Sequence, residues 1–500
     1  MFRKVLIANR GEIAVRIQRA CRALGVSPVA VHSDADAQAL HVRLADEAVR
    51  LGPAPSTESY LVQEKIIAAA QETGAEAIHP GYGFLSENAG FARAVEKAGL
   101  VWIGPSPDAM DQMGDKVAAR ANAEAAGVPV APGSEALRDA EHAAAEAERI
   151  GYPVMLKASA GGGGIGMRIV RDRKDLASEF ESATKQAASA FGVPDVFMEK
   201  FIQRPRHIEV QVLGDHHGHV VHLYERECSV QRRHQKLVEE APSPALSQAE
   251  REDIGARAVA LAQHVGYASA GTLEFLFERG DDGAPQWYFN EMNTRLQVEH
   301  PVTELVTGLD LVQWQLRIAA GEPLDVQQKD IKLQGHAFEA RINAEDPFAD
   351  FAPSPGPVHK LRLPQRPGIR VDHGLWEGWT VPAVYDSMVV KLLTHGKDRT
   401  EAADAMLQAL DDTVLDGFTT NMPFHERLFA HPVFRAGDLS TRFLEEHPLM
   451  ATTPAQRRLA AAVVMALKDA PGGGLAGAQL EQATPALTQR HPGRRAWEAA

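Results

Sequence analysis

Residues 272–293 read TLEFLFERGDDGAPQWYFNEMN, and this segment predicts a β-hairpin. Two β-like apolar runs flank Asp281-Asp282-Gly283-Ala284, which is typical of a turn. The midpoint between positions 274 and 291 falls inside that turn, so we expect Glu274 and Glu291 to lie opposite each other on antiparallel strands. Residues two apart share a face of a strand, which places Asn293 beside Glu291.

Two carboxylates and an amide oxygen on one face indicate a magnesium site. Mg²⁺ prefers hard oxygen ligands and commonly shares them with nucleotide phosphates. Like charges directly opposite each other destabilise a sheet unless a cation compensates them. A solvated acidic face is the structural alternative. We therefore expect Glu274, Glu291 and Asn293 to be metal ligands.

The polar pattern continues after residue 293. If residues 294–301 stay extended, Arg295, Gln297 and Glu299 lie on the same side. They would supply a guanidinium for an anion, an amide, and a general base next to a metal-bound phosphate. An ordinary ion-pair network is the alternative.

Residues 225–236 form a second polar segment that we interpret as a strand. Alternation along it would put His234 and Lys236 on one face. Such a pair suits a ribose, a phosphate or a small oxyanion, whereas basic residues on a strand more commonly form a solvated face. Its significance depends on the other motifs.

A glycine-rich loop, SAGGGGIGM at residues 159–167, separates the apolar runs 154–156 and 167–170. Glycines let backbone N–H groups approach phosphate oxygens with no Cβ in the way. The loop is not a P-loop, because the Gly-Lys-Ser/Thr ending is absent. Lys157, just before it, can offer a charge to phosphates. We expect a flexible lid over a nucleotide; a flexible hairpin tip is the alternative.

The remaining chain suggests several domains, since 500 residues correspond to about three domains of ordinary size. Residues 1–110 alternate short strands with helices, such as 5–8 and 12–24, which is typical of a parallel α/β sheet. The turn after the first strand lacks most glycines of a dinucleotide fingerprint, so an NAD site is not favoured. A β-rich segment reaches about residue 396, and the region after residue 447 resembles a linker or appendage.

The composition excludes some classes of protein. Lys and Arg number 52 and Asp and Glu 66, which gives a net charge of −14 and argues against a general nucleic-acid binder. Two cysteines, Cys21 and Cys228, cannot build a disulfide framework and suggest a reducing compartment. No apolar run approaches the ~20 residues needed to span a bilayer. We expect a cytoplasmic protein with neither nucleic acid nor membrane as a partner.

Several long motifs occur together: IANRGEIA at 7–14, HPGYGFLSEN at 79–88, MGDK at 113–116, QRRHQK at 231–236, EMNTRLQVEHP at 291–301 and ARINAEDP at 340–347. Over residues 1–447 the chain resembles the biotin carboxylase component of biotin-dependent acyl-CoA carboxylases, an ATP-grasp enzyme. The resemblance implies a mixed α/β and α+β fold. Its parts would be a parallel α/β pre-ATP-grasp domain at 1–113, an ATP-grasp domain at 114–330 with a mobile lid at about 131–203, a β-rich C-terminal domain at 331–447, and a helical or flexible tail at 448–500.

The resemblance also implies roles for individual residues. The implied ATP contacts are Lys116, Lys157, Gly163, Gly164, Met167, Glu199, Lys200, Phe201, Ile202, His207, Gln231 and His234. The implied magnesium or manganese ligands are Glu274, Glu291 and Asn293. The implied bicarbonate and carboxyphosphate contacts are Lys236, Arg295, Gln297 and Val298, with Glu299 as general base and Arg341 facing the biotin ureido oxygen.

The implied reaction carboxylates biotin from ATP and bicarbonate. No Ala-Met-Lys-Met biotin attachment motif occurs, and the nearest look-alike, Met388-Val389-Val390-Lys391, reads as a buried strand. We therefore expect biotin on a separate carrier protein or domain, a homodimer or larger complex, and, as a further partner, a carboxyltransferase subunit. Ala160 and Ile165 depart from the family's glycine loop, and Ile165 removes a cation near the phosphates. The alternatives are an ATP-grasp ligase that joins a carboxylate to an amine, and a catalytically inactive subunit.

Overall fold

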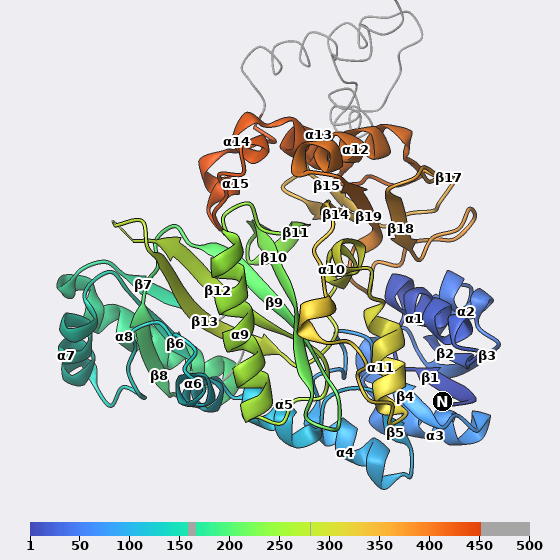
Figure 1. The fold of residues 1–500 in the computed structure, drawn as a ribbon, viewed down its shortest axis with the longest axis horizontal. Helices are drawn as coiled ribbons and strands as arrows, with labels where there is room; N and C mark the ends of the chain where they lie inside the picture. Colours follow the sequence, from blue (N-terminus) through green and yellow to red (C-terminus); the bar gives the residue numbers. More distant parts are fainter. Residues whose placement is uncertain (159–166, 281, 452–500) are drawn as a thin grey trace, which may run out of the picture.

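The computed structural model describes residues 1–158, 167–280 and 282–451 (Figure 1). The predictions for Ala160, Gly163, Gly164 and Ile165 lie outside these residues, as does the tail from residue 452. Within the described ranges, no helix combines the length and the apolar character that crossing a bilayer requires.

The N-terminal region contains the expected parallel sheet. Its strand order is β3-β2-β1-β4-β5, and every pairing is parallel. The strands are β1 (Lys4–Ile7), β2 (Ser27–Ser33), β3 (Glu47–Gly52), β4 (Ala77–His79) and β5 (Val101–Trp102). The helices are α1 (Gly11–Ala23), α2 (Leu40–Leu44), α3 (Gln63–Thr73), α4 (Ala89–Lys97) and α5 (Pro107–Gly114). Residues 5–7 of the central strand are fully buried, because helices cover both faces of the sheet.

A small unit with its own apolar core follows. An antiparallel sheet of order β7-β6-β8 packs against two long helices. Its elements are α7 (Ala140–Ile150), β6 (Val154–Ala158), β7 (Arg168–Val170), α8 (Arg173–Phe191) and β8 (Val196–Lys200). Helix α6 (Lys116–Ala125) precedes this unit in the chain and packs instead against α5 and the apolar core of the largest sheet. In Figure 1 this unit lies at the far left, away from the N-terminal sheet.

The largest sheet has eight strands in the order β13-β12-β9-β10-β11-β14-β19-β18, and its pairings are antiparallel. It is built from β9 (Arg206–Gly214), β10 (Val220–Arg232), β11 (Gln235–Ala241), β12 (Ser269–Arg279), β13 (Pro285–Asn293), β14 (His336–Asn343), β18 (Ile369–His373) and β19 (Met388–Gly396). Helix α9 (Gln248–His264) packs against β9 and β10 (Figure 1). The pairing of β11 with β14 carries the sheet across the domain boundary expected near residue 330.

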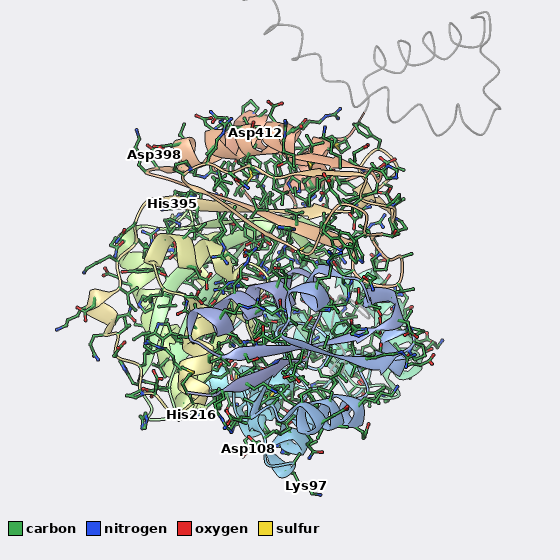
Figure 2. All side chains as sticks on the ribbon, turned by 90° about the vertical axis from the view of Figure 1, so that its right-hand side faces the viewer. Lys97, Asp108, His216, His395, Asp398 and Asp412 are labelled. Carbon is green, nitrogen blue, oxygen red and sulfur yellow. The ribbon has the colours of Figure 1, made fainter. Side chains whose placement is uncertain are left out.

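The remaining elements complete the connections and the C-terminal region. They are α10 (His300–Thr307), α11 (Leu311–Ala319), β15 (Glu345–Asp346), β16 (Ala352–Pro353), β17 (Lys360–Arg362), α12 (Arg399–Asp412), β20 (Val414–Asp416), α13 (Met422–Ala430), α14 (Pro432–Arg435) and α15 (Phe443–Glu446). Figure 2 shows side chains filling the space between the N-terminal and C-terminal regions. Tyr385, for example, hydrogen-bonds Ser33 across that boundary.

The expected register of the 272–293 hairpin is confirmed. Glu274 pairs with Glu291 and Thr272 with Asn293 across β12 and β13, and a bulge follows Glu274. The register could be predicted because a short turn between two strands leaves one symmetric pairing, whose midpoint lies in the turn.

The single strand expected over residues 225–236 is wrong. It is a hairpin: β10 ends at Arg232, and β11 begins at Gln235. Arg233 and His234 form the turn with φ of 51° and 65°. Positive φ at both central residues is what a tight hairpin turn needs, but Arg-His lacks the usual Asn-Gly signature. His234 therefore lies exposed in the turn, while Lys236 lies on β11 opposite Gln231.

The extended continuation after residue 293 is also wrong. Strand β13 ends at Asn293, and Glu299 is the residue that precedes α10. Pro301 lies in the first turn of that helix, where its fixed φ and missing N–H cost nothing. Alternation therefore does not place Arg295, Gln297 and Glu299 on one face.

Candidate active site

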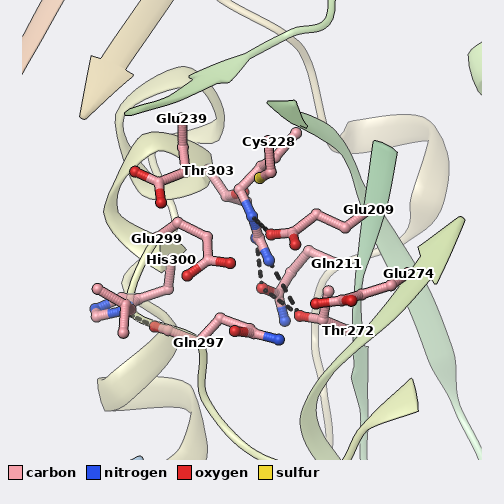
Figure 3. Close-up of polar contacts among 12 residues, drawn as sticks. Glu209, Gln211, Cys228, Glu239, Thr272, Glu274, Gln297, Glu299, His300 and Thr303 are labelled. Atoms are coloured by element: carbon pink, nitrogen blue, oxygen red, sulfur yellow. Dashed lines mark hydrogen bonds and ion pairs between the residues drawn. The ribbon is translucent and has the colours of Figure 1, made fainter. Parts of the chain in front are cut away.

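Lys236 lies at the centre of an acidic cluster. Its ammonium group donates to Glu299 Oε1 at 2.6 Å, to Glu274 Oε1 at 2.8 Å and to Glu209. Figure 3 shows these carboxylates pointing into the same region, from β9, β12 and the turn before α10. Although burial favours the neutral amine, the three carboxylates raise the pKa of Lys236 well above its usual value. The lysine is therefore a permanent cation in this site.

Glu274 and Glu291, the acidic pair predicted to bind a metal, have different environments and opposite pKa shifts. Glu274 is buried and also contacts His207 Nε2 at 3.2 Å and Asn293 Nδ2 at 2.9 Å. Burial opposes its ionisation, but Lys236 and His207 lower the pKa of Glu274. Glu291 is exposed, but the protein surrounding its carboxylate, together with the charge of Glu274, raises the pKa of Glu291. The same carboxylate of Glu274, with Glu209, raises the pKa of His207 to about 9 against the effect of burial.

The donor set fits a divalent cation. Glu291 has no ion-pair partner among the residues that the structure describes, although it lies opposite another carboxylate. A cation between Glu274 and Glu291, with the Asn293 amide oxygen nearby, would relieve that repulsion. A second cluster, His207, Glu209 and Glu274, also has metal-ligating atoms within 4.8 Å of one another. Lys236 already contacts two of its carboxylates, which disfavours a metal there.

Glu299 is fully buried between two cations. Its Oε1 accepts from Lys236, and its Oε2 accepts from Arg341 Nη2 at 2.9 Å. Burial and Glu209 oppose its charge, but Lys236 and Arg341 lower the pKa of Glu299. It is therefore a carboxylate at neutral pH. Arg341 of β14 also donates from Nε to Glu239 Oε1 at 2.7 Å.

A buried network that the sequence analysis missed holds the cluster in place. Arg226 is fully buried and donates to Glu209, to Gln211 Oε1 at 2.7 Å, to Thr303 Oγ1 at 2.9 Å and to Thr272 Oγ1 at 3.1 Å. Figure 3 shows these acceptors converging from three elements, β9, β12 and α10. The sequence signal was charged residues alternating with apolar ones on β9 and β10, which indicates polar side chains turned toward a buried face.

The predicted nucleotide contacts lie partly in the small unit. Lys157 of β6 pairs closely with Glu199 of β8, and Arg120 Nη1 lies 3.4 Å from Glu199 Oε1. Burial and the charge of Lys157 lower the pKa of Lys116, while Glu291 opposes that shift. Lys116 therefore lies within electrostatic range of both Lys157 and the acidic pair.

Other predicted residues make backbone or local contacts. Lys200 Nζ donates to the carbonyls of Gly151 at 2.8 Å and Tyr152 at 3.1 Å. The Phe201 N–H donates to the Pro153 carbonyl, and Ile202 is buried. Gln231 Nε2 donates to the Cys228 carbonyl at 2.8 Å.

The residues between β13 and α10 connect the site to the N-terminal region. Arg295 donates to Glu87 Oε2 at 2.8 Å and to Asn293 Oδ1 at 3.0 Å. Gln297 is buried beside it and accepts from Arg295 Nη1 at 3.3 Å. Met167 is the last residue of the glycine-rich loop and the only part of it that lies within the described residues. The chain thus brings Arg295, Lys236, Glu299 and Arg341 around the acidic pair, and leaves Gln231 and His234 at the β10–β11 hairpin.

Three family models match successive parts of the chain. They are "Biotin carboxylase, N-terminal domain" over residues 1–110, "Carbamoyl-phosphate synthase L chain, ATP binding domain" over 115–327, and "Biotin carboxylase C-terminal domain" over 339–446.

Curated relatives and solved structures agree with these matches. The biotin carboxylase of Halalkalibacterium halodurans is 54% identical over 448 residues, covering 89% of this chain and 98% of the relative. The biotin carboxylase of Haemophilus influenzae is 52% identical over 448 residues, covering 89% and 99%. The biotin carboxylase domain dimer of Hydrogenobacter thermophilus 2-oxoglutarate carboxylase, solved with MgADP and bicarbonate, is similar with a TM-score of 0.85 and 48% identity over 91% of this chain and 99% of that one. The chain belongs to the biotin carboxylase family.

Proposed function

We propose that the chain carboxylates biotin, using ATP and bicarbonate and passing through carboxyphosphate, as the first half-reaction of a biotin-dependent carboxylase. The observation that carries this proposal is Glu299, a buried carboxylate with a cation on each oxygen, next to an acidic pair that fits a divalent metal. A base, anion-binding cations and a metal-nucleotide site are what bicarbonate phosphorylation requires together. An amine ligase would not need the second cation, Arg341, at the base.

The first step would use Glu299 as the base. Bicarbonate is a poor nucleophile, so Glu299 takes its proton as the bicarbonate oxygen attacks the γ-phosphorus and ADP leaves with the bonding pair. Lys236 and Arg295 would bind bicarbonate. They would donate to it the hydrogen bonds that they donate to carboxylates and an amide in this structure. Glu274, Glu291 and Asn293 would hold Mg²⁺ or Mn²⁺, which neutralises phosphate charge.

The second step would use Arg341. Carboxyphosphate breaks down to CO₂ and phosphate, and the phosphate takes the proton from biotin N1. The ureido oxygen then carries negative charge, which the Arg341 guanidinium stabilises, and N1 attacks CO₂. Water would hydrolyse carboxyphosphate, so a lid is expected to close over the site.

We propose further that Lys116, Lys157, Met167, Glu199, Lys200, Phe201, Ile202, His207, Gln231 and His234 contribute to the nucleotide site, with Gln297 and Val298 beside bicarbonate. The proximity of Lys116, Lys157 and the acidic pair supports this assignment. We also propose a division into 1–113, 114–330 with a lid at about 131–203, and 331–447. The lid is supported by the apolar core of the small unit, which is confined to residues 137–198.

Relatives belong to larger carboxylases. The propionyl-CoA carboxylase alpha chain of Ruegeria pomeroyi is 50% identical over 470 residues, which are 90% of this chain but 68% of that relative. As partners we propose a second copy of the chain in a homodimer, a carrier protein or domain bearing biotin, and a carboxyltransferase subunit. The two buried free thiols, Cys21 and Cys228, support a cytoplasmic location.

The test is ADP release by the purified chain with MgATP, bicarbonate and free biotin. We expect release to require bicarbonate and to rise with biotin, and Glu299→Gln to abolish it. Glu240→Gln is the matched control, because Glu240 is equally buried but pairs with Arg399 and His336 outside the cluster. Stimulation by an amine acceptor instead of biotin would refute the proposal, and full activity of Glu299→Gln would refute the role of the base.

A further inference from the structure

Lys391 is a fully buried lysine that the proposed mechanism does not use. It lies on β19 directly opposite Arg341 of β14, with 0% of its side chain exposed. Burying an ammonium group is costly unless it is paired and hydrogen-bonded. The same burial excludes Lys391 as an attachment site in the folded chain, so the expectation of a buried strand at residues 388–391 is confirmed.

The ammonium group of Lys391 bonds the turn that carries Glu299. Its Nζ donates to the carbonyl oxygen of Val298 at 2.9 Å. That carbonyl belongs to the peptide group whose nitrogen is the backbone nitrogen of Glu299. The preceding carbonyl group is held as well, because His300 Nδ1 lies 2.7 Å from the backbone carbonyl oxygen of Gln297. Both peptide groups before the proposed base therefore have buried side-chain donors.

The N-terminal region holds the ammonium group from the other side. Glu12 of α1 places Oε2 at 3.4 Å from Lys391 Nζ and is itself buried. The hydroxyl of Tyr82 donates to the other oxygen of Glu12, and the Tyr82 ring centroid lies 6.0 Å from the ammonium group. Residues from three distant parts of the chain thus meet at one ammonium group.

Two other carboxylates lie near Lys391. Asp372 of β18 pairs with Lys391 in the sheet register, but its oxygens accept hydrogen bonds from Arg370 and Arg19. Glu339 of β14 is fully buried, and neither of its oxygens has a hydrogen-bond partner within the described residues. Burial raises the pKa of Glu339 well above its usual value, although Lys391 opposes the shift. Among these carboxylates, Glu12 is the one whose oxygen lies within ion-pair distance of the Lys391 ammonium group.

We propose that Lys391, held by Glu12 and Tyr82, is a positioning residue that fixes the Val298–Glu299 peptide group and so aims the Glu299 carboxylate at Lys236 and Arg341. The inference rests on the proposed function for its catalytic meaning, but the geometric claim stands on its own. With this role for Lys391, Glu299 can act as the base only when α1, β19 and the turn before α10 pack together. A shift of about 1 Å in a catalytic group costs up to about 100-fold in rate.

The experiment compares Lys391→Met with the wild type. Methionine keeps the length and apolar stem but cannot donate to Val298. We expect kcat for bicarbonate-dependent ATP cleavage to fall about 10- to 100-fold, with the KM for ATP changed less than about twofold. Lys391→Arg, which can still donate, should recover part of the loss. Tyr82→Phe, a milder change at the same network, should show a smaller loss of the same kind.

The matched control is Thr394→Val, a fully buried position on the same strand. Its hydroxyl donates to the Ala402 carbonyl at 2.8 Å and does not reach the turn before α10. Thr394→Val should lower thermal stability without changing kcat. Equal losses of kcat in Thr394→Val and Lys391→Met would show a merely structural effect and overturn the inference.

Crystal structures of the wild type and Lys391→Met separate the two proposals. We expect the 298–299 peptide group to turn in the variant and Glu299 Oε1 to leave its 2.6 Å contact with Lys236. An unmoved peptide group overturns the positioning role whatever the activity. A wild type that cleaves no ATP with bicarbonate, together with a moved peptide group in the variant, supports the positioning role and refutes the proposed function.

Discussion

Replacing Lys236 with methionine tests the electrostatic account of the site. The side chain is largely buried and is the shared partner of Glu209, Glu274 and Glu299. Methionine has a similar length, so the variant removes the charge without leaving a large cavity. We expect the free energy of unfolding to fall by about 3–5 kcal/mol, the range for breaking a buried ion pair.

The magnitude follows from opposing terms. Each contact near hydrogen-bond distance is worth about 6 kcal/mol by Coulomb's law at an effective dielectric constant of about 20. Desolvation of the ammonium group and repulsion among the three carboxylates offset most of that sum. Each carboxylate also keeps a second partner: Arg226 for Glu209, His207 for Glu274 and Arg341 for Glu299. The loss is therefore that of one buried pair rather than three.

The effect of Lys236→Met on the free energy of unfolding should also depend on pH. In the wild type the pKa values of Glu209, Glu274 and Glu299 are lowered, so their stabilisation is present above their unfolded-state pKa of about 4.3 and is lost as the pH falls through the folded values. Without Lys236 these pKa values should rise, so the variant's carboxylates take up protons at a higher pH than those of the wild type. The difference in unfolding free energy between wild type and variant should therefore narrow as the pH falls.

The assay is denaturant unfolding of both proteins at several pH values without nucleotide. Lys185→Met is the matched control, because Lys185 pairs with Glu181 at the surface, where such a pair is worth less than about 1 kcal/mol. A Lys236→Met variant as stable as the wild type, or a difference that does not change with pH, would refute the reasoning. A loss of unfolding free energy as large as that of three independent ion pairs would also refute it.

Three further predictions concern other parts of the molecule. Arg341→Met should abolish biotin-stimulated turnover but leave bicarbonate-dependent ATP cleavage measurable, because Glu299 keeps Lys236; equal loss of both rates would contradict the role of Arg341. Glu291→Gln should raise the Mg²⁺ concentration for half-maximal ATP cleavage by about tenfold or more, and an unchanged metal titration would exclude Glu291 as a ligand. Burial lowers the pKa of His41 to about 4, below the unfolded value of about 6.5, so its stabilisation is present above pH 6.5 and falls by about 1 kcal/mol between pH 7.5 and 5.5. His41→Gln should remove that part of the pH dependence in thermal unfolding, and an identical pH slope in the variant would contradict it.

Local patterns in the sequence were enough for the parallel sheet of the N-terminal region and for the pairing of Glu274 with Glu291. The spacing of apolar residues that marks a strand or a helix, and the residues typical of a short turn, extend over only a few positions. A short stretch of sequence is therefore enough to recognise them. The same reasoning failed at residues 225–236, where an unusual turn dipeptide ends β10, and at residues 294–299, which are not a strand but lead from β13 into α10. Motif resemblance named Lys236, Glu299 and Arg341 without showing how they meet.

The tertiary structure revealed what joins them. Arg226 and Glu209, which hold Lys236 in place, carry no motif. The pattern at residues 388–391 predicted a buried strand but not the hydrogen bond from Lys391 to the Val298 carbonyl. Their partners lie tens to hundreds of positions away, on strands that are neighbours only because one eight-stranded sheet passes from the central region into the C-terminal region. Such contacts depend on which strands pair and how chain segments pack. The spacing of residues along the sequence does not show these contacts, because the groups whose interactions stabilise the site come together only when the chain folds.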